Sequence, residues 1–255
     1  MGERESYAPG TFSWVELVTG DADAAKTFYG ALFGWDYDDR PAGDMTYTMV
    51  SRDGREVAGL FADPQQPPHW NNYVTVASAD EAAEKASRLG AKVAAPPFDV
   101  MDAGRMAVIG DPTGAFIAVW QAGAHPGARL VNAPGALAWN DLVTRDLEAA
   151  KRFYAEWMGW TLVEMPESGG YHVIRNGERS NGGMQPFRPG MPEDLPSHWM
   201  PYFGIEDLDA ALSRVPDLGG QVVARKMDLP GGSIAVFTDP QGALFAALWS
   251  DSYDD

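Results

Sequence analysis

The sequence lacks cysteine entirely and has only four histidines among its 255 residues. The absence of cysteine excludes disulfide bonds, thiolate zinc sites, iron–sulfur clusters and a cysteine nucleophile. Glycine and proline are present without a collagen-type period, and hydrophobic residues make up 45% of the chain. That proportion is enough to build a hydrophobic core, so a disordered or fibrous protein is also excluded.

Positive charge is scarce as well: the chain has 19 Lys and Arg but 36 Asp and Glu, which gives a net charge of −17. Such a chain repels phosphate, so we expect neither nucleic acid nor an anionic membrane as a partner. It attracts cationic small molecules, although surface acidity often serves solubility alone. The longest apolar runs, 116–120 and 244–249, are too short to span a bilayer, and residues 1–10 show no secretory signal. We therefore expect a cytoplasmic protein.

The strongest positive feature is an internal duplication. The segment WVELVTGDADAAKTFYGALFGW, residues 14–35, recurs 125 positions later as WNDLVTRDLEAAKRFYAEWMGW, residues 139–160. Two shorter pairs follow, HWNNY at 69 with HWMPY at 198, and GDPTGA at 110 with TDPQGA at 238. A repeat of this length indicates a duplicated domain. We predict one domain at 10–122, a Gly-, Ala- and Pro-rich linker at 123–134 and a second domain at 135–250.

Each half shows the same order of elements. Residues 12–18 alternate as a strand, and Asp21 is a suitable N-cap for a helix whose apolar residues recur at helical spacing up to Gly34. Further short strands follow near 46–50 and 56–61. A second strand–helix–strands segment begins near Trp70, and its last two strands are joined by a DPxG sequence typical of a type I turn. Each half therefore reads as two βαβββ units.

This order, with its GD…A..FY...FGW helix and its DPxG turn, resembles the vicinal oxygen chelate superfamily. That superfamily includes glyoxalase I, extradiol dioxygenases, fosfomycin-modifying enzymes and bleomycin-resistance proteins, and the duplicated pattern looks like two-domain, glyoxalase-like actinobacterial proteins. The resemblance implies an α+β fold of two tandem domains, each a pair of βαβββ units that form a cupped mixed sheet. It also implies that the two halves pack together as the family's dimers do, giving a monomer with pseudo-symmetric halves or a further homodimer.

In metal-dependent members of the superfamily, His, Gln and Glu ligands come from defined strand positions. Carried over, these positions hold neither a carboxylate nor an imidazole; they are Trp14 and Trp139, near Gly59 and Gly183, Asn71 and Met200, and Ala118 and Ala246. Catalytic zinc needs about three protein ligands, and non-haem iron sites use two His and a carboxylate. We therefore expect no bound metal or other cofactor.

Strand alternation, with the family's orientation, predicts the side chains that face each cup. The expected ligand-binding residues are Trp14, His69, Asn71, Tyr73 and Trp120 in the first cup, and Trp139, His198, Met200 and Tyr202 in the second. The expected catalytic residues are Glu16 and Asp141.

Each assignment has a simpler alternative. Glu16 and Asp141 could act as acid, base or anchor for a cation, because burial raises the pKa of a carboxyl group, or they could form structural ion pairs or face solvent. His69 and His198 could be bases, or strand-start residues bonded to backbone. Trp14 and Trp139 could stack on a flat or cationic ligand or belong to the core.

Three functions remain open at this point. The first is a metal-free protein that binds a small aromatic or cationic compound in a Trp-lined cup, as bleomycin-resistance proteins do. The second is an enzyme of the glyoxalase, lyase or dioxygenase kind, with a noncanonical metal site that includes Glu16 and His69, or with acid/base chemistry at Glu16 or Asp141. The third is an interaction protein with a vestigial pocket.

Overall fold

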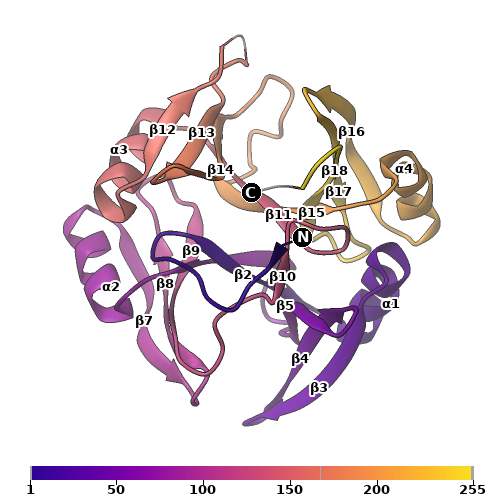
Figure 1. Ribbon diagram of the computed structural model, residues 1–255, viewed down its shortest axis with the longest axis horizontal. Helices are drawn as coiled ribbons and strands as arrows, with labels where there is room; N and C mark the ends of the chain where they lie inside the picture. The colour runs from indigo at the N-terminus through magenta and orange to yellow at the C-terminus, as the bar shows by residue number, and fades with distance from the viewer. Residues whose placement is uncertain (1, 167, 254–255) are drawn as a thin grey trace.

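The computed structural model describes residues 2–166 and 168–253 and shows two curved sheets, one for each half of the chain (Figure 1). The first sheet has the strand order β3-β4-β5-β2-β6-β9-β8-β7 and the second β12-β13-β14-β11-β15-β18-β17-β16. Elements of the first domain are β2 (Phe12–Thr19), α1 (Ala22–Phe33), β3 (Asp36–Ala42), β4 (Met45–Arg52), β5 (Arg55–Ala62), β6 (His69–Thr75), α2 (Ala79–Arg88), β7 (Lys92–Val100), β8 (Gly104–Gly110) and β9 (Phe116–Ala122).

The second domain repeats this order. Its elements are β11 (Leu137–Thr144), α3 (Leu147–Met158), β12 (Thr161–Glu164), β13 (His172–Asn176), β14 (Arg179–Pro186), β15 (His198–Gly204), α4 (Leu208–Asp217), β16 (Gln221–Leu229), β17 (Gly232–Thr238) and β18 (Leu244–Ser250). In each domain the first strands of the two βαβββ units, β2 with β6 and β11 with β15, pair antiparallel, whereas β2–β5, β6–β9, β11–β14 and β15–β18 pair parallel. The predicted α+β fold of two cupped mixed sheets is confirmed.

The first helix of each domain begins and ends where local chemistry directs it. The side chain of Asp21 accepts a hydrogen bond from the Ala24 backbone N–H at 3.0 Å, as an N-cap does. Gly34 ends α1 in the left-handed conformation at φ 68°, which glycine adopts without a Cβ clash. Asp146 and Gly159 do the same for α3. Both ends agree with the predicted helix signals.

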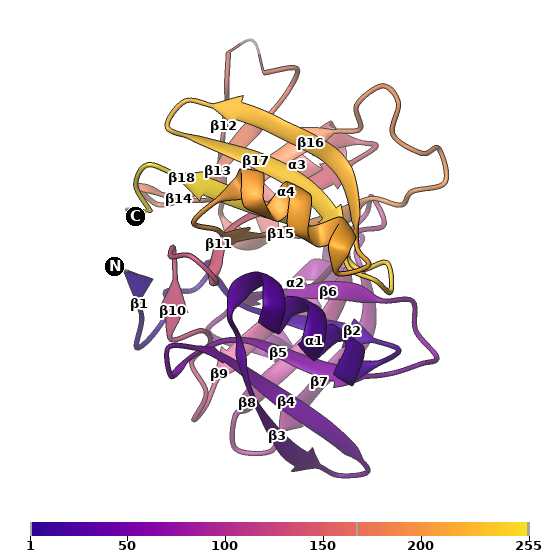
Figure 2. The same ribbon diagram turned by 90° about the vertical axis from the view of Figure 1, so that its right-hand side faces the viewer.

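The two domains pack through the sheet faces that carry the helices, so the opposite, concave faces point away from each other (Figures 1 and 2). Helix α1 contacts α4 and α2 contacts α3, while β6 and β15 meet in the middle of the interface. There the Asn72 side-chain amide donates a hydrogen bond to the Trp199 carbonyl at 3.3 Å. The molecule thus presents two separate cups on opposite sides of one shared core.

The recurring sequence motifs meet at this interface. The Trp70 indole donates to the Tyr29 hydroxyl at 3.1 Å, and that hydroxyl donates to Asp239 Oδ2 of the other domain at 3.2 Å. Asp239 belongs to the DPxG turn, and its Oδ1 accepts three backbone N–H groups of that turn. The same arrangement, with the domains exchanged, joins Trp199, Tyr154 and Asp111. The FY, HW and DPxG motifs therefore hold the two domains together.

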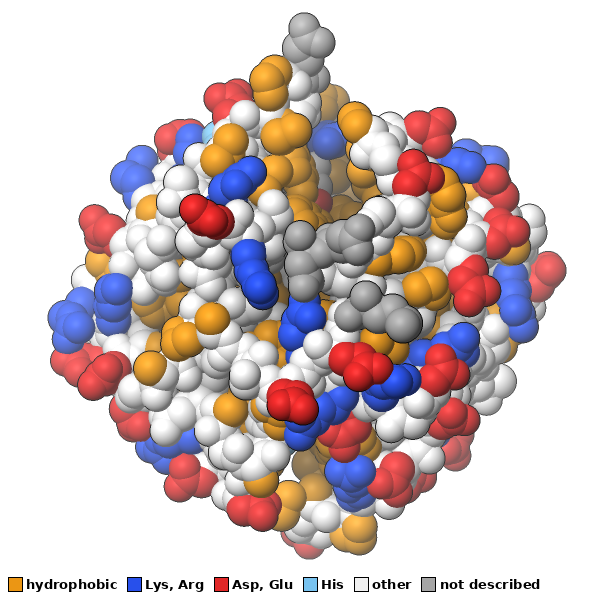
Figure 3. All heavy atoms as spheres, viewed as in Figure 1, with side chains coloured by type: hydrophobic (Ala, Val, Ile, Leu, Met, Phe, Trp, Pro, Cys, Tyr) orange, Lys and Arg blue, Asp and Glu red, His pale blue; other side chains and the backbone are white. Residues whose placement is uncertain are grey.

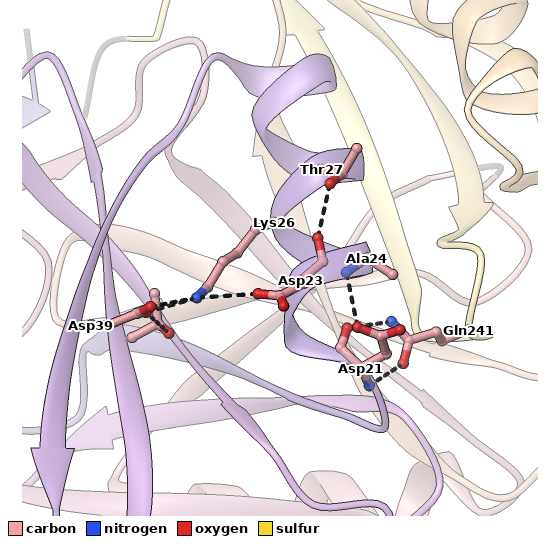
Figure 4. A network of polar contacts seen from close by, with 8 residues as sticks. Asp21, Asp23, Ala24, Lys26, Thr27, Asp39 and Gln241 are labelled. Atoms are coloured by element: carbon pink, nitrogen blue, oxygen red, sulfur yellow. Dashed lines mark hydrogen bonds and ion pairs between the residues drawn. The ribbon is translucent and has the colours of Figure 1, made fainter.

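Two further kinds of contact cross the interface. The Trp35 indole donates to the Gly135 carbonyl at 2.7 Å, and the Trp160 indole donates to the Gly10 carbonyl at 2.8 Å. Gln241 binds the start of α1 from the other domain, because its Oε1 accepts from the Asp21 N–H at 2.7 Å and its Nε2 donates to the Asp21 carbonyl at 2.8 Å (Figure 4). The tryptophan contact occurs in both halves. The Gln241 contact occurs once, because the equivalent residue Thr113 donates its hydroxyl to Asp111 in its own turn.

The segment 123–134, expected as a linker, forms regular contacts with both sheets. It includes the short strand β10 (Leu130–Val131), which pairs with β1 (Gly2–Glu3) and with β11. The backbone N–H groups of Ala128 and Arg129 donate to the carbonyls of Ser13 and Glu56, both at 2.7 Å. The N-terminal residues and this segment therefore lie at the joint between the domains. Within the described ranges, none of the helices has the length and apolar character needed to cross a membrane.

The interface tyrosines give a first prediction. Tyr29→Phe and Tyr154→Phe should each lower the free energy of unfolding by about 1–3 kcal/mol, because each leaves a buried indole N–H and one buried carboxylate oxygen without a partner. Urea unfolding followed by tryptophan fluorescence measures the change. Thr27→Val is the control, since it removes an exposed hydroxyl from the same helix and should shift stability by less than about 0.5 kcal/mol. Tyrosine variants as stable as this control would contradict the assigned role.

Candidate functional site

The floor of the first cup is built around Glu16, on the central strand β2. Its side chain is 8% exposed, and its Oε1 accepts a hydrogen bond from the Tyr73 hydroxyl at 2.9 Å and from the Asn71 amide at 3.4 Å. Burial raises the pKa of Glu16 above its ordinary value of 4.5, while the hydrogen bonds from Tyr73, Tyr47 and Asn71 oppose that rise. A carboxyl group in this setting can exchange a proton closer to neutral pH than an exposed one.

The floor of the second cup has Asp141 at the equivalent position of β11. Its Oδ1 accepts from the Trp139 indole at 3.0 Å and from the Tyr171 hydroxyl at 2.9 Å. Its Oδ2 accepts from the Tyr202 hydroxyl at 2.7 Å and from the Gln185 amide at 3.2 Å. Burial raises the pKa of Asp141, as it does for Glu16. Because each of its oxygens already accepts two hydrogen bonds, Asp141 fixes the orientation of these four side chains.

A glycine opposite each carboxylate makes room for a tyrosine. Gly59 pairs with Glu16 and Gly183 with Asp141 across the parallel strand pairs. A Cβ at Gly59 would lie 1.9 Å from the Tyr47 hydroxyl, and one at Gly183 would lie 2.1 Å from the Tyr171 hydroxyl. The phenol of each tyrosine therefore fills the space that any other residue at the glycine would take.

The first cup is covered by the chain that leaves β9. The His125 ring packs edge-on against Trp14 with ring centroids 4.6 Å apart, and its Nδ1 lies 3.5 Å from Glu56 Oε2. The Trp120 indole donates to the His125 carbonyl at 2.9 Å. Both tryptophans are consequently buried, at 4% and 6% exposure, although strand alternation directs both toward the cup. Their surfaces are in contact with this protein's own linker.

The second cup is more open and more apolar. Trp139 is only partly buried, and it packs in one cluster with Met200, Tyr202 and four aliphatic side chains of β17 and β18. Those four are Ile234, Val236, Leu244 and Leu248. Figure 3 shows a hollow with hydrophobic walls between the β12–β14 and β16–β18 halves of this domain. In the first domain the wall beside β5 is instead charged, with Arg40 bound to Asp38 and Glu56.

The two predicted histidines lie at equivalent positions, at the start of β6 and β15. The Nδ1 atoms of His69 and His198 each lie 2.8 Å from a backbone carbonyl oxygen, of Pro67 and Pro196 respectively. This geometry is the backbone hydrogen bond of the simpler interpretation. Burial lowers the pKa of His198, so its imidazole stays neutral at neutral pH.

The positions where the superfamily places metal ligands do not suit a metal here. Trp14, Gly59, Asn71 and Ala118 in the first cup, and Trp139, Gly183, Met200 and Ala246 in the second, offer one amide and one thioether as their only donors. The Gly59 and Gly183 positions are already filled by tyrosine hydroxyls. In the part of the chain that the structure describes, no three His, Asp or Glu side chains gather in a way that could hold a metal ion. We therefore derive no chemistry through one.

Sequence reasoning missed several side chains at the two floors. Tyr47, Tyr171 and Gln185 contact the carboxylates or their tryptophan neighbours, and Arg188 donates to Gln185 Oε1 at 3.1 Å. The one available signal was the pairing of a glycine in β5 and β14 with a tyrosine twelve positions earlier, which holds in both halves.

Glu16 gives a prediction on pH dependence. Below pH 4.5 the carboxyl group is protonated in both the folded and the unfolded chain, and as the pH rises through the higher pKa of the folded state the buried group must ionise at a cost. Glu16→Gln, which never ionises, should therefore gain stability relative to the unsubstituted protein between pH 4.5 and pH 7.5. Urea titrations of both proteins across this range measure the difference, and a difference that stays constant with pH would contradict a raised pKa.

Gly183 gives a second prediction. Gly183→Ala should lower the free energy of unfolding by roughly 1–3 kcal/mol, because the new methyl group displaces Tyr171 from Asp141. Gly20→Ala is the matched control, since the nearest atom to its added Cβ is at an ordinary 3.5 Å. Urea unfolding and near-ultraviolet circular dichroism report stability and the packing of the aromatic floor. Equal stability of the two variants would show that the cup tolerates a side chain at Gly183.

Comparisons with known proteins agree with this architecture. The model of the Glyoxalase/Bleomycin resistance protein/Dioxygenase superfamily matches twice, over residues 11–119 and 136–247. A protein of Mycobacterium tuberculosis named "Putative glyoxylase CFP32" is 42% identical over 97% of this chain and 98% of its own length. The anthracycline biosynthesis protein DnrV of Streptomyces peucetius is 32% identical over 95% of this chain and 94% of its own length.

Solved structures show the same fold at low sequence identity. The Mn(II)-bound glyoxalase from Novosphingobium aromaticivorans superposes with a TM-score of 0.68 at 14% identity, over 100% of this chain and 86% of that one. A catechol 2,3-dioxygenase superposes with a TM-score of 0.65 at 19% identity, over 96% of this chain and 90% of that one. The chain therefore belongs to the Glyoxalase/Bleomycin resistance protein/Dioxygenase superfamily, with one superfamily domain in each half.

Proposed function

We propose that the protein binds a small aromatic or cationic compound in a cup without the help of a metal. One observation carries this proposal: each cup floor sets a buried carboxylate among aromatic side chains. Apolar pockets with a few convergent polar groups are the usual form of small-molecule sites. The supply of aromatic surface in a concave sheet favours stacking and burial as the source of affinity.

The second cup is the better candidate for the ligand. Trp139 remains partly accessible there, whereas Trp14 is covered by His125 of the linker. The ring of Trp139 is held by hydrogen bonds to Asp141 and Tyr171, so little further ordering is needed when a flat molecule stacks on it. Similarity to anthracycline biosynthesis proteins supports a fused-ring phenolic compound, and the net charge of −17 supports one with an amino group.

A second candidate function is metal-independent acid/base catalysis at Glu16. It is favoured by the raised pKa of this buried carboxyl group and by its fewer hydrogen bonds compared with Asp141. Under this proposal Glu16 would accept a proton from a bound substrate or donate one to it. The substrate would take the place of the His125 ring beside Trp14. Asp141, whose oxygens already hold four donors, would keep an orienting role.

The remaining expectations belong to the same proposal. The protein would act in the cytoplasm on a small molecule, without nucleic acid or membrane partners. As a single chain it would replace the dimer of one-domain relatives, because its two domains already bury each other's tyrosine, tryptophan and aspartate motifs.

The test compares daunorubicin, a flat aromatic with a cationic amino sugar, with its neutral aglycone daunomycinone. Both should bind EDTA-treated protein and raise its melting temperature, since a ligand stabilises the state it binds. Asp141→Asn should weaken daunorubicin binding about fivefold more than aglycone binding, because it removes the negative charge beneath the cup floor that attracts the amino group, an effect of ~1 kcal/mol. Fluorescence titration gives the affinities.

Asp38→Asn is the control, because it removes the same charge from an exposed site on the first domain. Elemental analysis after loading with Mn²⁺, Ni²⁺, Zn²⁺ and Fe²⁺ and then desalting should find no stoichiometric metal. Binding that requires one of these ions, or no binding of either probe, would refute the proposal. Chemical conversion of a probe that is lost in Glu16→Gln would select the enzyme instead.

A further inference from the structure

A hollow lies away from both cups, between helices α1 and α4 of the two domains. It has a volume of about 290 Å³, near the lower end of the range for small-molecule sites. Its walls come from the last turn of α1, the first turns of α4, Arg52 of β4 and residues 134–135 and 204–205. Figure 1 shows α1 beside α4 on one side of the molecule and α2 beside α3 on the other. The duplication therefore provides an equivalent place with which the hollow can be compared.

The equivalent place between α2 and α3 is filled by an indole. Trp157, the penultimate residue of α3, is 4% exposed, and its Nε1–H donates to the Ala82 carbonyl of α2 at 2.9 Å. Lys85, further along α2, donates to the Trp157 carbonyl at 2.9 Å. One tryptophan thus joins α3 to α2 through both its side chain and its backbone.

The indole is missing between α1 and α4. The penultimate residue of α1 is Leu32, whose side chain is smaller than an indole and has no N–H. Leu32 lines the hollow together with Ala211, which holds the same position in α4 as Ala82 in α2. Arg214 stands where α2 has Lys85, and its guanidinium has no hydrogen bond or ion pair within the described part of the chain. The hollow therefore includes the space that an indole fills in the other half.

The lining of the hollow suits a neutral, flat ring with one N–H group. Its basic and acidic residues balance each other, being Arg52, Arg214, Glu206 and Asp207. Such a lining does not favour a charge of either sign on the ligand. The rest of the wall includes Leu32, Phe33 and the small side chain of Ala211, and the Arg214 guanidinium is available to lie over the face of a ring. The carbonyl at the position of Ala211 is the one that accepts the indole N–H in the other half.

We propose that this hollow is a binding site for a small indole compound, whose ring takes the place that Trp157 holds between α2 and α3. The ring N–H donates to the Ala211 carbonyl, and the ring packs between the end of α1 and the first turns of α4. The site is independent of the cup function proposed above, because the lining of the hollow contains none of the residues of either cup floor.

The probe for this site is indole itself, followed by ¹H–¹⁵N NMR of the labelled protein. Amide signals of the last turn of α1 and the first turns of α4 should shift saturably, with a Kd that is roughly millimolar because the ligand has few atoms. Benzofuran has the same shape but no N–H, and it should bind about fivefold more weakly. Signals of β11 and β15 report any binding in the second cup separately, so a failure of this proposal is distinct from a failure of the cup function.

Substitutions at the two equivalent helix positions test the comparison on which the site rests. Leu32→Trp fills the hollow with an indole of the chain itself, and it should weaken indole binding at α1 and α4 at least about tenfold. Leu32→Met is the matched control, because its similar volume leaves the hollow open and the affinity unchanged. Trp157→Leu opens the equivalent space, so indole should then shift amide signals of α2 and α3 as well.

Each of three results would overturn the proposal. They are an absence of saturable shifts at α1 and α4, equal affinities of Leu32→Trp and Leu32→Met, and a folded Trp157→Leu protein without new shifts at α2 and α3. If Trp157→Leu fails to fold, the two Leu32 variants still decide the matter. N-acetyltryptophanamide presents the ring as a protein side chain does, and tighter binding of it than of indole at α1 and α4 would assign the hollow to a partner protein instead.

Discussion

The tyrosine hydroxyl that lies between an indole of its own domain and a carboxylate of the other is the contact on which the architecture depends. It occurs twice, at Tyr29 and Tyr154, and its carboxylate belongs to the turn that joins the last two strands of the opposite sheet. Since that carboxylate also accepts the backbone N–H groups of its turn, one buried charge fixes both a turn and a domain interface. The two cups keep their relative position because these contacts hold their convex faces together.

The duplicated motifs made the fold predictable. Capping residues, helical spacing and DPxG turns are local signals. Their repetition about 125 residues later indicated that the chain folds as four βαβββ units, two in each half. The role of the same motifs in joining the domains was not predictable, because it depends on long-range packing. Tyr29, for example, reads as one apolar residue of a helical stripe, and only the structure shows its hydroxyl beside Asp239.

The candidate site was predictable in part. Alternation along β2 and β11 identified Glu16 and Asp141, but not the tyrosines that bind them. Tyr47 lies in a hairpin, and Tyr171 directly before one, whose register shifts at a bulge, and such a shift cannot be counted from a period of two. The amide donor also changes strand between the domains, from Asn71 on β6 to Gln185 on β14. Equivalent carboxylates thus have similar burial but different neighbours.

The connection between the domains breaks the symmetry that the duplication created. A single chain needs only one such connection, and here it runs over one cup, where His125 rests on Trp14 and the following residues pair with β2 and β5. The described residues after β18 instead bind back to their own sheet, where the Tyr253 hydroxyl contacts the backbone of Ile205 and Leu248. The single connection therefore gives two repeated cups different surroundings. Equivalent substitutions in the two cups meet different neighbours, so one cup is no guide to the effect of a change in the other.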